Sequence, residues 1–484
     1  MATVVVEPEL RRSEGHADAT PRTRAPSRGE LAALAGIAGA VVAGTILRLW
    51  GLGAGRLTYD ESFTAMVGRL PITHLVSYLA HHDSHPPLDY VLRAPLARAG
   101  VSELWFRMPS ALCSIAALAL FGWWVRHRGF AGVVATTAMA VSAFQLTHGR
   151  EARMYAEMEL IGVGAAVLAD AWLRRPRRGH AIAIGAVVFL GLMTHVSGFL
   201  LGAGILACAG TRRDRDAWEW RGAIVAAGVA WAALWGPTFA VQARGGHSDW
   251  IPATSFHGLV DALGRAVTFR SVAYEVVVLA VLVGAIAILR RDRTLGRVWL
   301  CCFAAPVAVG AAAGLALPVV IDRTFTVVSW GPLLAIGFAV DALARRLRVA
   351  GAFAFVALLA VMLPSTAYAL ATRSGPDVAI RHLQAVVRPG DVVAVRPAWK
   401  GVETEWSLGV RGRESFRTVR IGVAPGAESR IVGGAPVSGR VWVLDWHHYA
   451  LPNTTPCAPT WQRGTSRIEC LRVPTSSIAI PRTG

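Results

Sequence analysis

Residues 31–50 read LAALAGIAGAVVAGTILRLW, an apolar run that is long enough to cross a bilayer as one helix. A polar stretch rich in proline and arginine, residues 1–30, precedes it and is typical of a disordered basic tail. A cleavable signal peptide has a shorter apolar core that begins nearer the start of the chain. We therefore predict that residues 31–50 form an uncleaved first membrane span.

Further apolar runs follow along the chain and predict more spans. A membrane helix needs about 20 predominantly apolar residues. The runs lie near residues 108–125, 129–147, 158–173, 181–195, 197–211, 222–240, 274–290, 298–318, 326–343 and 350–370. We therefore predict an all-α polytopic membrane bundle of about eleven transmembrane helices over residues 31–370.

The composition agrees with a membrane protein. Of the 484 residues, 54% are hydrophobic and only 17% are charged, whereas about a quarter of the residues in soluble proteins are charged. The net charge of +18 raises the question of nucleic-acid binding. However, the arginines lie in short clusters between apolar runs, without a basic stripe and interleaved aromatic residues. The composition therefore predicts a lipid bilayer and no nucleic acid as partner.

The arginine clusters predict the orientation of the spans. Short loops rich in Lys and Arg lie on the cytoplasmic side of a membrane. The predicted spans place several clusters on the same side as the basic tail: Arg126–Arg128, Arg174–Arg178, Arg212–Arg215, Arg290–Arg293 and Arg345–Arg348. We therefore predict a multi-pass protein of the plasma membrane with a cytoplasmic N terminus. The loop of residues 51–107 and the region after residue 370 would lie on the extracytoplasmic side.

The last region, residues 371–484, has the composition of a soluble domain. Residues 380–387 have helical character, and a turn is expected at Pro389–Asp391. Residues 392–395 and 440–445 are typical of buried strands. We predict a small extracytoplasmic α/β domain, which is the part of the chain expected to contact an acceptor.

The cysteines occur in two settings. Four lie inside apolar runs and are interpreted as small buried residues: Cys113, Cys208, Cys301 and Cys302. Cys457 and Cys470 lie in the C-terminal region, where export would permit a disulfide between them. The spacing of the cysteines is not that of a metal site.

Asp60 and Glu61 are adjacent carboxylates soon after the first span. One interpretation is a solvated loop in which Asp60 caps the start of a helix. The other is an active site at the membrane surface, in which the pair supplies a base and metal ligands. Neighbouring side chains on a helix point about 100° apart, so both need not face one site. We predict that both are catalytic, with Asp60 as the main residue.

A second polar cluster lies later in the same loop: His81, His82, Asp83 and His85, just before Pro86 and Pro87. The prolines restrict the backbone and would hold His85 rigidly. Imidazole and carboxylate groups bind divalent cations or phosphate, although an ordinary polar turn is the alternative. We predict that Asp83 and His85 bind substrate. With Asp60 they also form the candidate ligand set for Mg²⁺ or Mn²⁺, and no organic cofactor is expected.

Arg150, Glu151, Arg153 and Tyr155 follow a span on the predicted external side. Arginines on that side run against the positive-inside bias and need another reason. Guanidinium groups bind phosphate oxygens in a bidentate manner, which favours phosphate recognition over an internal ion pair with Glu151. Arg323, in a short external loop, supports the same argument more weakly. We predict that these five residues bind the substrate phosphate.

Four motifs in this order resemble those of the GT-C superfamily of membrane glycosyltransferases: Tyr59–Ser62, Asp83–Tyr90, Arg107–Leu112 and Arg150–Ala156. The chain is most similar to bacterial relatives of protein O-mannosyltransferases and of the lipid A aminoarabinose transferase. The resemblance covers residues 31–345 well and the C-terminal region loosely. It implies a polyprenyl-phosphate sugar donor, inversion at the anomeric carbon, and helices lying along the external surface.

The resemblance also implies a role for each polar element. Asp60 matches the catalytic acidic residue of the first external loop, and Glu61 is its usual neighbour. Asp83 and His85 match an element that holds a metal or the donor phosphate in relatives. A third group matches the element that lies near the donor in relatives: Arg150, Glu151 and Arg153. The sequence departs from the family at Asp89, where relatives usually carry Tyr, and at Asp322–Arg323, where Arg-Tyr is commoner.

These observations predict transfer of a sugar from a polyprenyl-phosphate donor to an extracytoplasmic glycan, lipid or protein, with Asp60 as the base. Nucleotide sugars remain in the cytoplasm, so an external site needs a lipid-linked donor. A lipid or sugar transporter is one alternative, but transporters carry ionisable groups near the bilayer midplane and internal repeats. These spans carry few charges, and His195 is interpreted as a polar residue between helices. A non-catalytic envelope scaffold is the other alternative.

Overall fold

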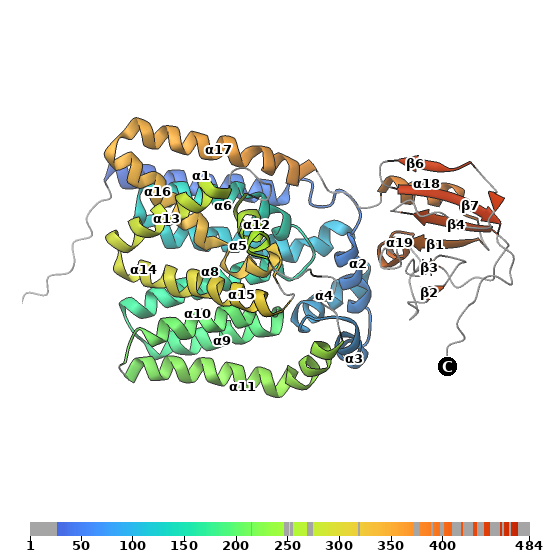
Figure 1. Ribbon diagram of the computed structural model, residues 1–484, viewed down its shortest axis with the longest axis horizontal. Coiled ribbons are helices and arrows are strands. Elements are labelled where there is room, and N and C mark those ends of the chain that lie inside the picture. Colours follow the sequence, from blue (N-terminus) through green and yellow to red (C-terminus); the bar gives the residue numbers. More distant parts are fainter. Residues whose placement is uncertain are drawn as a thin grey trace, which may run out of the picture.

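The structure is a computed structural model in which a helical bundle is followed by a smaller domain built on a sheet (Figure 1). It describes residues 27–213, 215–245, 251, 255–268, 274–317, 320–371, 377–388, 391–396, 401–408, 418–419, 429–432, 440–445, 455–456, 459–463 and 466–472.

Long helices run side by side through the bundle, and three shorter ones lie across one end of it (Figure 1). The helices that run through the bundle are α1 (Arg28–Leu49), α5 (Glu103–Val125), α6 (Phe130–Val141), α7 (Ala143–Gly149), α8 (Tyr155–Arg174), α9 (Arg178–Thr194), α10 (Gly198–Gly210), α11 (Arg215–Arg244), α13 (Tyr274–Arg291), α14 (Arg293–Trp299), α15 (Ala305–Ala316), α16 (Trp330–Arg346) and α17 (Arg348–Ala371). The helices across the end are α2 (Tyr59–Gly68), α3 (Ile72–His82) and α4 (Leu88–Ala99). The remaining segments are η1 (Arg126–Arg128), α12 (Phe256–Thr268), η2 (Leu300–Ala304) and η3 (Asp322–Val328).

Over the described residues, each apolar run predicted to span the membrane falls on one helix or on consecutive helical segments. Among the described residues, five helices are long and apolar enough to cross a bilayer. The number rises to seven if each bent pair, α6 with α7 and η3 with α16, is one span. Helices α9 and α10 are apolar but shorter. The fold is therefore that of a multi-pass bundle, and the count of about eleven spans stays a prediction.

The bundle packs tightly because small residues let helices approach each other. A Cβ atom at Gly162 of α8 would come within 1.8 Å of the Val327 carbonyl oxygen in η3. A Cβ atom at Gly284 of α13 would come within 1.9 Å of the Ala335 carbonyl oxygen in α16. Small residues at helix contacts are typical of membrane bundles, where close packing replaces the hydrophobic effect between helices.

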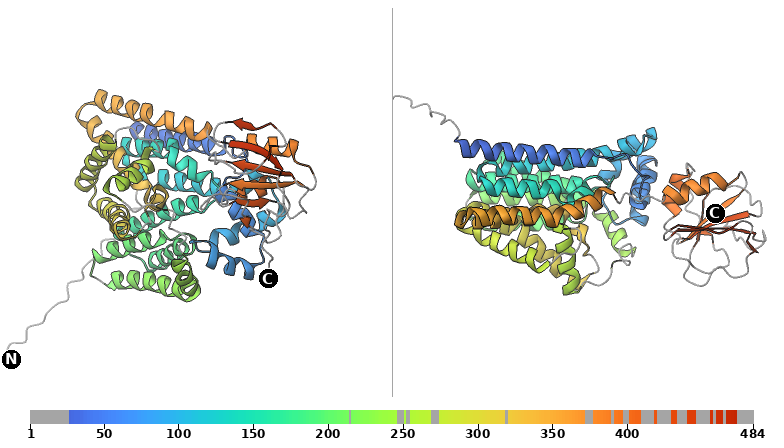
Figure 2. Two further views of the ribbon diagram at one scale, coloured as in Figure 1. Left: turned by 45° about the vertical axis from the view of Figure 1, so that its right-hand side comes forward. Right: turned by 90° about the horizontal axis from the view of Figure 1, so that it is seen from above.

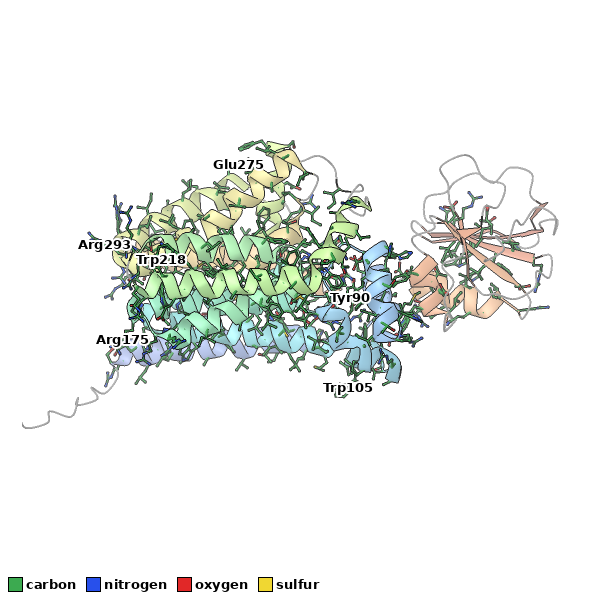
Figure 3. All side chains as sticks on the ribbon, turned by 90° about the horizontal axis from the view of Figure 1, so that it is seen from below. Tyr90, Trp105, Arg175, Trp218, Glu275 and Arg293 are labelled. Carbon is green, nitrogen blue, oxygen red and sulfur yellow. The ribbon has the colours of Figure 1, made fainter. Side chains whose placement is uncertain are left out.

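The two ends of the bundle differ in charge. Arg175 and Arg293 lie at the end opposite to Tyr90 (Figure 3). At that end Arg174 bridges Asp170 and Asp292 at 3.0 and 2.8 Å. We call it the arginine end, and it holds the loops with Arg128, Arg174, Arg291 and Arg345. These loops gather on one side of the bundle, as the positive-inside argument predicts, and the orientation of that side in a membrane stays a prediction.

The N-terminal boundary differs slightly from the prediction of a tail over residues 1–30. Helix α1 already begins at Arg28, where Ser27 and Glu30 form a capping box. The part of the predicted tail before residue 27 lies outside the described residues.

The C-terminal domain consists of helices against a mixed sheet. Its elements are α18 (Asp377–Val386), β1 (Val392–Arg396), α19 (Gly401–Ser407), β2 (Thr418–Val419), β3 (Ser429–Val432), β4 (Arg440–Asp445), β5 (Thr455–Pro456), β6 (Trp461–Arg463) and β7 (Ser466–Arg472). The strand order is β2-β3-β1-β4-β7-β5, with β6 beside β7. Strands β1 and β4 are parallel, and apolar residues of α18 pack on the same core.

The predicted helix at residues 380–387 and the predicted strands at 392–395 and 440–445 are confirmed as α18, β1 and β4. The predicted turn falls partly on Pro389 and Gly390, outside the described residues. Cys470 is in a disulfide, and its predicted partner Cys457 lies outside the described residues.

The C-terminal domain lies beyond the end of the bundle that holds α2 (Figure 2), and its helix α19 contacts α2. Trp406 packs against apolar residues around Leu57 and Ala65. The Arg69 guanidinium lies 4.2 Å from the centre of the Trp406 ring, a cation–π contact. Arg56 donates a hydrogen bond to the Ser407 carbonyl at 3.1 Å. The domain is thus attached through the first helix of the long loop at residues 51–107.

Candidate active site

Asp60 lies in the first turn of α2, and a capping box fixes where that helix begins. The Thr58 hydroxyl accepts a hydrogen bond from the Glu61 N–H, and the Glu61 carboxylate accepts one from the Thr58 N–H at 2.9 Å. The residue that caps the helix is therefore Thr58, which corrects the interpretation that Asp60 is the cap. The side chains of Asp60 and Glu61 point in different directions from the helix, as the angle between neighbouring residues on a helix predicts.

Glu61 turns toward Arg107 of α5, where its carboxylate is saturated with hydrogen bonds. It accepts two bonds from the Arg107 guanidinium, both at 2.7 Å, and one from the Ala152 N–H at 2.8 Å. Burial alone would raise the pKa of Glu61, but the bonds from Arg107 outweigh it and hold the pKa below its usual value. Because Glu61 is only 1% exposed, the arrangement favours a structural role over the predicted catalytic one.

Asp60 turns toward η3 and pairs with Arg323, which lies 263 positions later in the chain. The distance from Asp60 Oδ2 to Arg323 Nη1 is 2.9 Å, and their side chains are 29% and 25% exposed. Burial by itself would raise the pKa of Asp60, but positive Arg153 and Arg323 lower it below its usual value. Asp60 is therefore an anion at neutral pH, and solvent reaches it.

Asp83 and Arg153 meet at the hydroxyl of Tyr90. Tyr90 donates a short hydrogen bond to Asp83, and Arg153 donates to the same hydroxyl at 3.0 Å. Arg153 also donates to the Thr64 hydroxyl at 2.9 Å. Burial raises the pKa of Asp83, and Arg153 and Tyr90 only partly oppose the rise. The pKa values of Asp60 and Asp83 are thus shifted in opposite directions, a pattern typical of catalytic carboxylate pairs.

Aromatic rings form a wall beside the carboxylates. His85 and His195 stack with their ring centres 4.6 Å apart, and Tyr155 meets His195 at 5.8 Å. The Arg323 guanidinium lies 5.7 Å from the centre of the Tyr155 ring. Burial lowers the pKa of His85 to about 3, and Arg153 and Arg323 add to this effect. His85 is therefore neutral at neutral pH and offers a hydrogen bond rather than a positive charge.

Arg150 and Glu151 lie outside this group. Arg150 donates a short hydrogen bond to the Trp50 carbonyl after α1, and Glu151 faces His148 at 3.4 Å. In the described contacts, neither residue bonds to the Asp60 carboxylate. The same segment brings two other predicted residues into the site: Arg153 and Tyr155.

Asp89, one of the departures from the family pattern, is part of a buried ion pair. Its carboxylate accepts a bond from Arg93 at 2.6 Å, and both side chains are 1% exposed. Arg93 also donates to Glu157 of α8 at 2.7 Å and to Ser110 of α5 at 2.6 Å. The aspartate at this position therefore ties α4 to the bundle and is not open to a substrate.

The predicted metal ligands are not arranged as a metal site. Within the described part of the chain, His, Cys, Asp and Glu side chains form no group of three that could hold an ion. Asp60 is paired with Arg323, and Asp83 accepts from Tyr90. The residues do not fit Mg²⁺ or Mn²⁺ in this arrangement, and the two guanidinium groups of Arg153 and Arg323 supply positive charge instead.

Sequence reasoning missed Tyr90, Thr64 and Arg107 as members of the site and its support. Tyr90 stands in a motif that resembles the family, but nothing in the sequence indicates that its hydroxyl joins Asp83 to Arg153. The sequence did contain a sign that Glu61 helps to begin a helix. Thr58 is followed three residues later by Glu, which is the pattern of a capping box.

Apolar helices side by side, with carboxylates and guanidinium groups gathered at one end, define a multi-pass membrane protein. The structure is similar to that of ArnT from Cupriavidus metallidurans bound to undecaprenyl phosphate. The TM-score is 0.51 at 13% sequence identity, and the match covers 93% of this chain and 99% of that chain. No protein-family model matches the sequence, and no curated protein matches it.

Proposed function

We propose that this chain is a membrane glycosyltransferase that moves a sugar from a polyprenyl-phosphate donor to an extracytoplasmic acceptor. The observation that carries the proposal is the solvent-reachable ion pair of Asp60 and Arg323, with Arg153 and Asp83 beside it. A carboxylate next to fixed guanidinium groups suits a reaction in which a hydroxyl loses a proton while a phosphate leaves. The similarity to ArnT, whose structure holds undecaprenyl phosphate, supports a donor of this class.

Asp60 acts as the base in the proposed reaction. It takes the proton of the acceptor hydroxyl while the hydroxyl oxygen bonds to the anomeric carbon. The bond from that carbon to the phosphate oxygen breaks, and polyprenyl phosphate leaves with the electron pair. Because phosphate is a stable anion, no general acid is needed. Attack opposite to the leaving group inverts the anomeric carbon.

Arg323 links donor binding to the basicity of Asp60. In the structure it pairs with Asp60 and lowers the pKa of that carboxyl, which makes Asp60 a weak base. A phosphodiester that binds the same guanidinium competes with Asp60 for it. The pKa of Asp60 then rises toward the range in which a carboxylate is an effective base. Asp60 becomes reactive when the donor is in place.

Arg153 provides a second, more rigid contact for the phosphate. Bonds to Thr64 and to Tyr90 hold its guanidinium, and the residue as a whole is 4% exposed. Its buried Nε has no hydrogen-bond partner among the described residues. A buried donor without a partner is costly, so a ligand oxygen at this position would stabilise the complex.

The proposal is tested with the full-length protein in nanodiscs and a panel of radiolabelled polyprenyl-phosphate sugars, with an envelope extract as acceptor. We expect sugar release or transfer from one donor, and a loss of about 100-fold or more in the Asp60→Asn variant. Asp216→Asn, the same change at an exposed residue of α11, is the matched control and should keep full activity.

Two results would contradict the proposal. Transfer by Asp60→Asn at the rate of the unchanged protein would rule out Asp60 as the base. A folded protein that binds none of the donors would point to a non-catalytic scaffold or to a transporter.

A further inference from the structure

Arg323 belongs to η3, a short segment that packs along one face of α8. The Arg323 guanidinium lies 5.7 Å from the centre of the Tyr155 ring, at the start of α8. Further along the helix, a Cβ atom at Gly162 would come within 1.8 Å of the Val327 carbonyl oxygen in η3. Glu159 lies between Tyr155 and Gly162, and the helical spacing places all three on the same face. The face of α8 that meets η3 therefore contains a buried carboxylate.

Hydrogen bonds connect the Glu159 carboxylate to η3. The Gln145 amide satisfies both of its neighbours when its nitrogen faces Glu159: it donates to the two carboxylate oxygens at 2.6 and 2.8 Å, and its oxygen accepts from the Ser329 hydroxyl at 2.7 Å. Ser329 follows η3 directly, and its hydroxyl also lies 2.7 Å from the Thr326 carbonyl oxygen. The Thr326 hydroxyl in turn donates to the Arg323 carbonyl at 2.7 Å. Side chains thus connect Glu159 to the backbone of Arg323.

Glu159 is also anchored to two other helices. Ser114 of α5 donates to its carboxylate at 3.1 Å, and Arg48 of α1 donates to the Ser114 hydroxyl at 2.8 Å. Arg48 donates as well to the Gly44 and Ala140 carbonyls, at 3.1 and 3.3 Å. Ionisable groups deep among apolar helices are costly unless their partners are fixed. We call six residues the buried polar network, and each is 1% exposed or less: Arg48, Ser114, Gln145, Glu159, Thr326 and Ser329.

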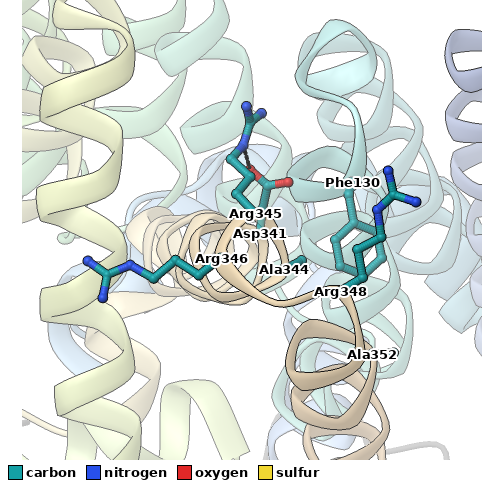
Figure 4. Close-up of a pocket in the computed structure, with 7 residues that line it drawn as sticks. All are labelled: Phe130, Asp341, Ala344, Arg345, Arg346, Arg348 and Ala352. Atoms are coloured by element: carbon teal, nitrogen blue, oxygen red, sulfur yellow. Dashed lines mark hydrogen bonds and ion pairs between the residues drawn. The ribbon is translucent and has the colours of Figure 1, made fainter.

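Helix α16, which follows η3, is held by contacts that do not involve this network. At the arginine end, Asp341 pairs with Arg345 at 2.9 Å (Figure 4), and it also pairs with Arg291 of α13. Near η3, the Trp299 indole donates to the Gly331 carbonyl at 2.9 Å. Segment η3 meets α16 at a bend of 68°, so the helix does not continue through the junction. The direction of η3 therefore depends on its own side-chain contacts.

We propose that the buried polar network positions Arg323 for the donor phosphate, with Glu159 as its central residue. The network fixes η3 against α8, and this sets where the Arg323 guanidinium lies relative to Asp60 and Arg153. Its members touch neither the substrate nor the reacting atoms, so they are positioning residues. The inference rests on the proposed function, which supplies the ligand of Arg323.

The first test removes one hydroxyl from the network. Thr326→Val deletes the bond to the Arg323 carbonyl and keeps the shape of the side chain. We expect the donor KM to rise about fivefold, the effect of one lost hydrogen bond. The acidic limb of the profile of kcat/KM against pH should move to higher pH, because a displaced Arg323 lowers the pKa of Asp60 less.

Two further variants control this test. Thr326→Ser keeps a hydroxyl at the same position and should restore both values. Thr136→Val is the matched control, because the buried Thr136 hydroxyl donates to the Gly132 carbonyl of its own helix at 2.8 Å. It should leave the donor KM and the acidic limb unchanged.

A second measurement does not depend on turnover. Hydrogen exchange of the backbone amides in η3, measured by mass spectrometry on the full-length protein in nanodiscs, reports how firmly the segment is held. The exchange should be about fivefold faster in Thr326→Val, and also in Gln145→Met, which removes the bonds between Glu159 and Ser329. Thr136→Val should leave it unchanged. If Gln145→Met does not fold, Thr326→Val decides the comparison.

Three results would overturn the inference. The exchange of η3 could stay the same in Thr326→Val, or Thr136→Val could change the donor KM as much. The effect of Thr326→Val could also persist in full when Arg323→Gln is already present, which would show that the network does not act through Arg323. If the unchanged protein turns over no donor, the proposed function fails, and the exchange comparison decides whether the network fixes η3.

Discussion

Asp60 and Glu61 are neighbours on α2, and each pairs with an arginine. The two pairs differ in burial and in the number of hydrogen bonds. Glu61 and Arg107 are buried, and their hydrogen bonds are saturated. Asp60 and Arg323 are joined by one bond of 2.9 Å and reach solvent. A buried and saturated pair holds structure, because breaking it leaves a bare charge inside the protein. A half-exposed pair can be opened by a ligand at little cost, which suits a catalytic site.

The largest effect is expected from Glu61→Gln. This change leaves the Arg107 charge buried and partly unpaired, which costs about 3–5 kcal/mol of folding free energy. The same change in charge at the other pair, Asp60→Asn, should cost less than about 1 kcal/mol, because that pair is partly exposed. Thermal denaturation of both variants in the same nanodiscs measures the difference. Equal stability of the two would show that the distinction between the pairs is wrong.

A smaller effect, on the pH dependence of the reaction, is expected from Arg323→Gln. Arg323 lowers the pKa of Asp60, so its removal raises that pKa. The base must be ionised, and the acidic limb of the profile of kcat/KM against pH should therefore move to higher pH. The donor KM should rise as well, by about tenfold, because one phosphate contact is lost. If the donor affinity falls but the acidic limb does not move, Arg323 binds the donor without setting the pKa of Asp60.

The smallest effect is expected from Tyr90→Phe. The change removes the hydroxyl that joins Asp83 to Arg153 and keeps the ring. A hydrogen bond of this kind contributes about 1 kcal/mol, so kcat/KM should fall by several-fold while the protein stays folded. Tyr78→Phe is a matched control on α3, and steady-state kinetics should show no comparable loss. A loss as large as that of Asp60→Asn would mean that Tyr90 itself takes part in the chemistry.

The sequence predicted the helices well, because apolar runs have to be helical in a bilayer. A backbone N–H or C=O group without a hydrogen-bond partner is costly in hydrocarbon. Each apolar run therefore forms a helix, in which the backbone groups bond to one another whatever lies around the helix. The arginine clusters are equally local, and they gather at one end of the bundle as predicted (Figure 3). The bends between α6 and α7 and between η3 and α16 were not predicted, since they depend on packing against neighbouring helices.

The site was predicted only in part, because residue types do not reveal partners. Arg150 and Arg153 looked alike in the sequence, but Arg150 bonds to the Trp50 carbonyl while Arg153 reaches Tyr90 and Thr64. His85 was predicted to bind substrate and to be a candidate metal ligand, and its charge was not predicted: burial and two nearby arginines keep its imidazole neutral. Burial and neighbouring charge set these properties, and neither can be read from the local sequence.

The sequence by itself determined the apolar runs, the capping box that starts α2 at Thr58, and the divergence of Asp60 from Glu61. Each follows from residues within one or two turns of each other. Only the tertiary structure decided that Arg323 meets Asp60, that Arg107 meets Glu61, and that the predicted metal ligands do not form a metal site. The Asp60–Arg323 contact joins residues 263 positions apart, so the packing of the whole bundle had to bring them together.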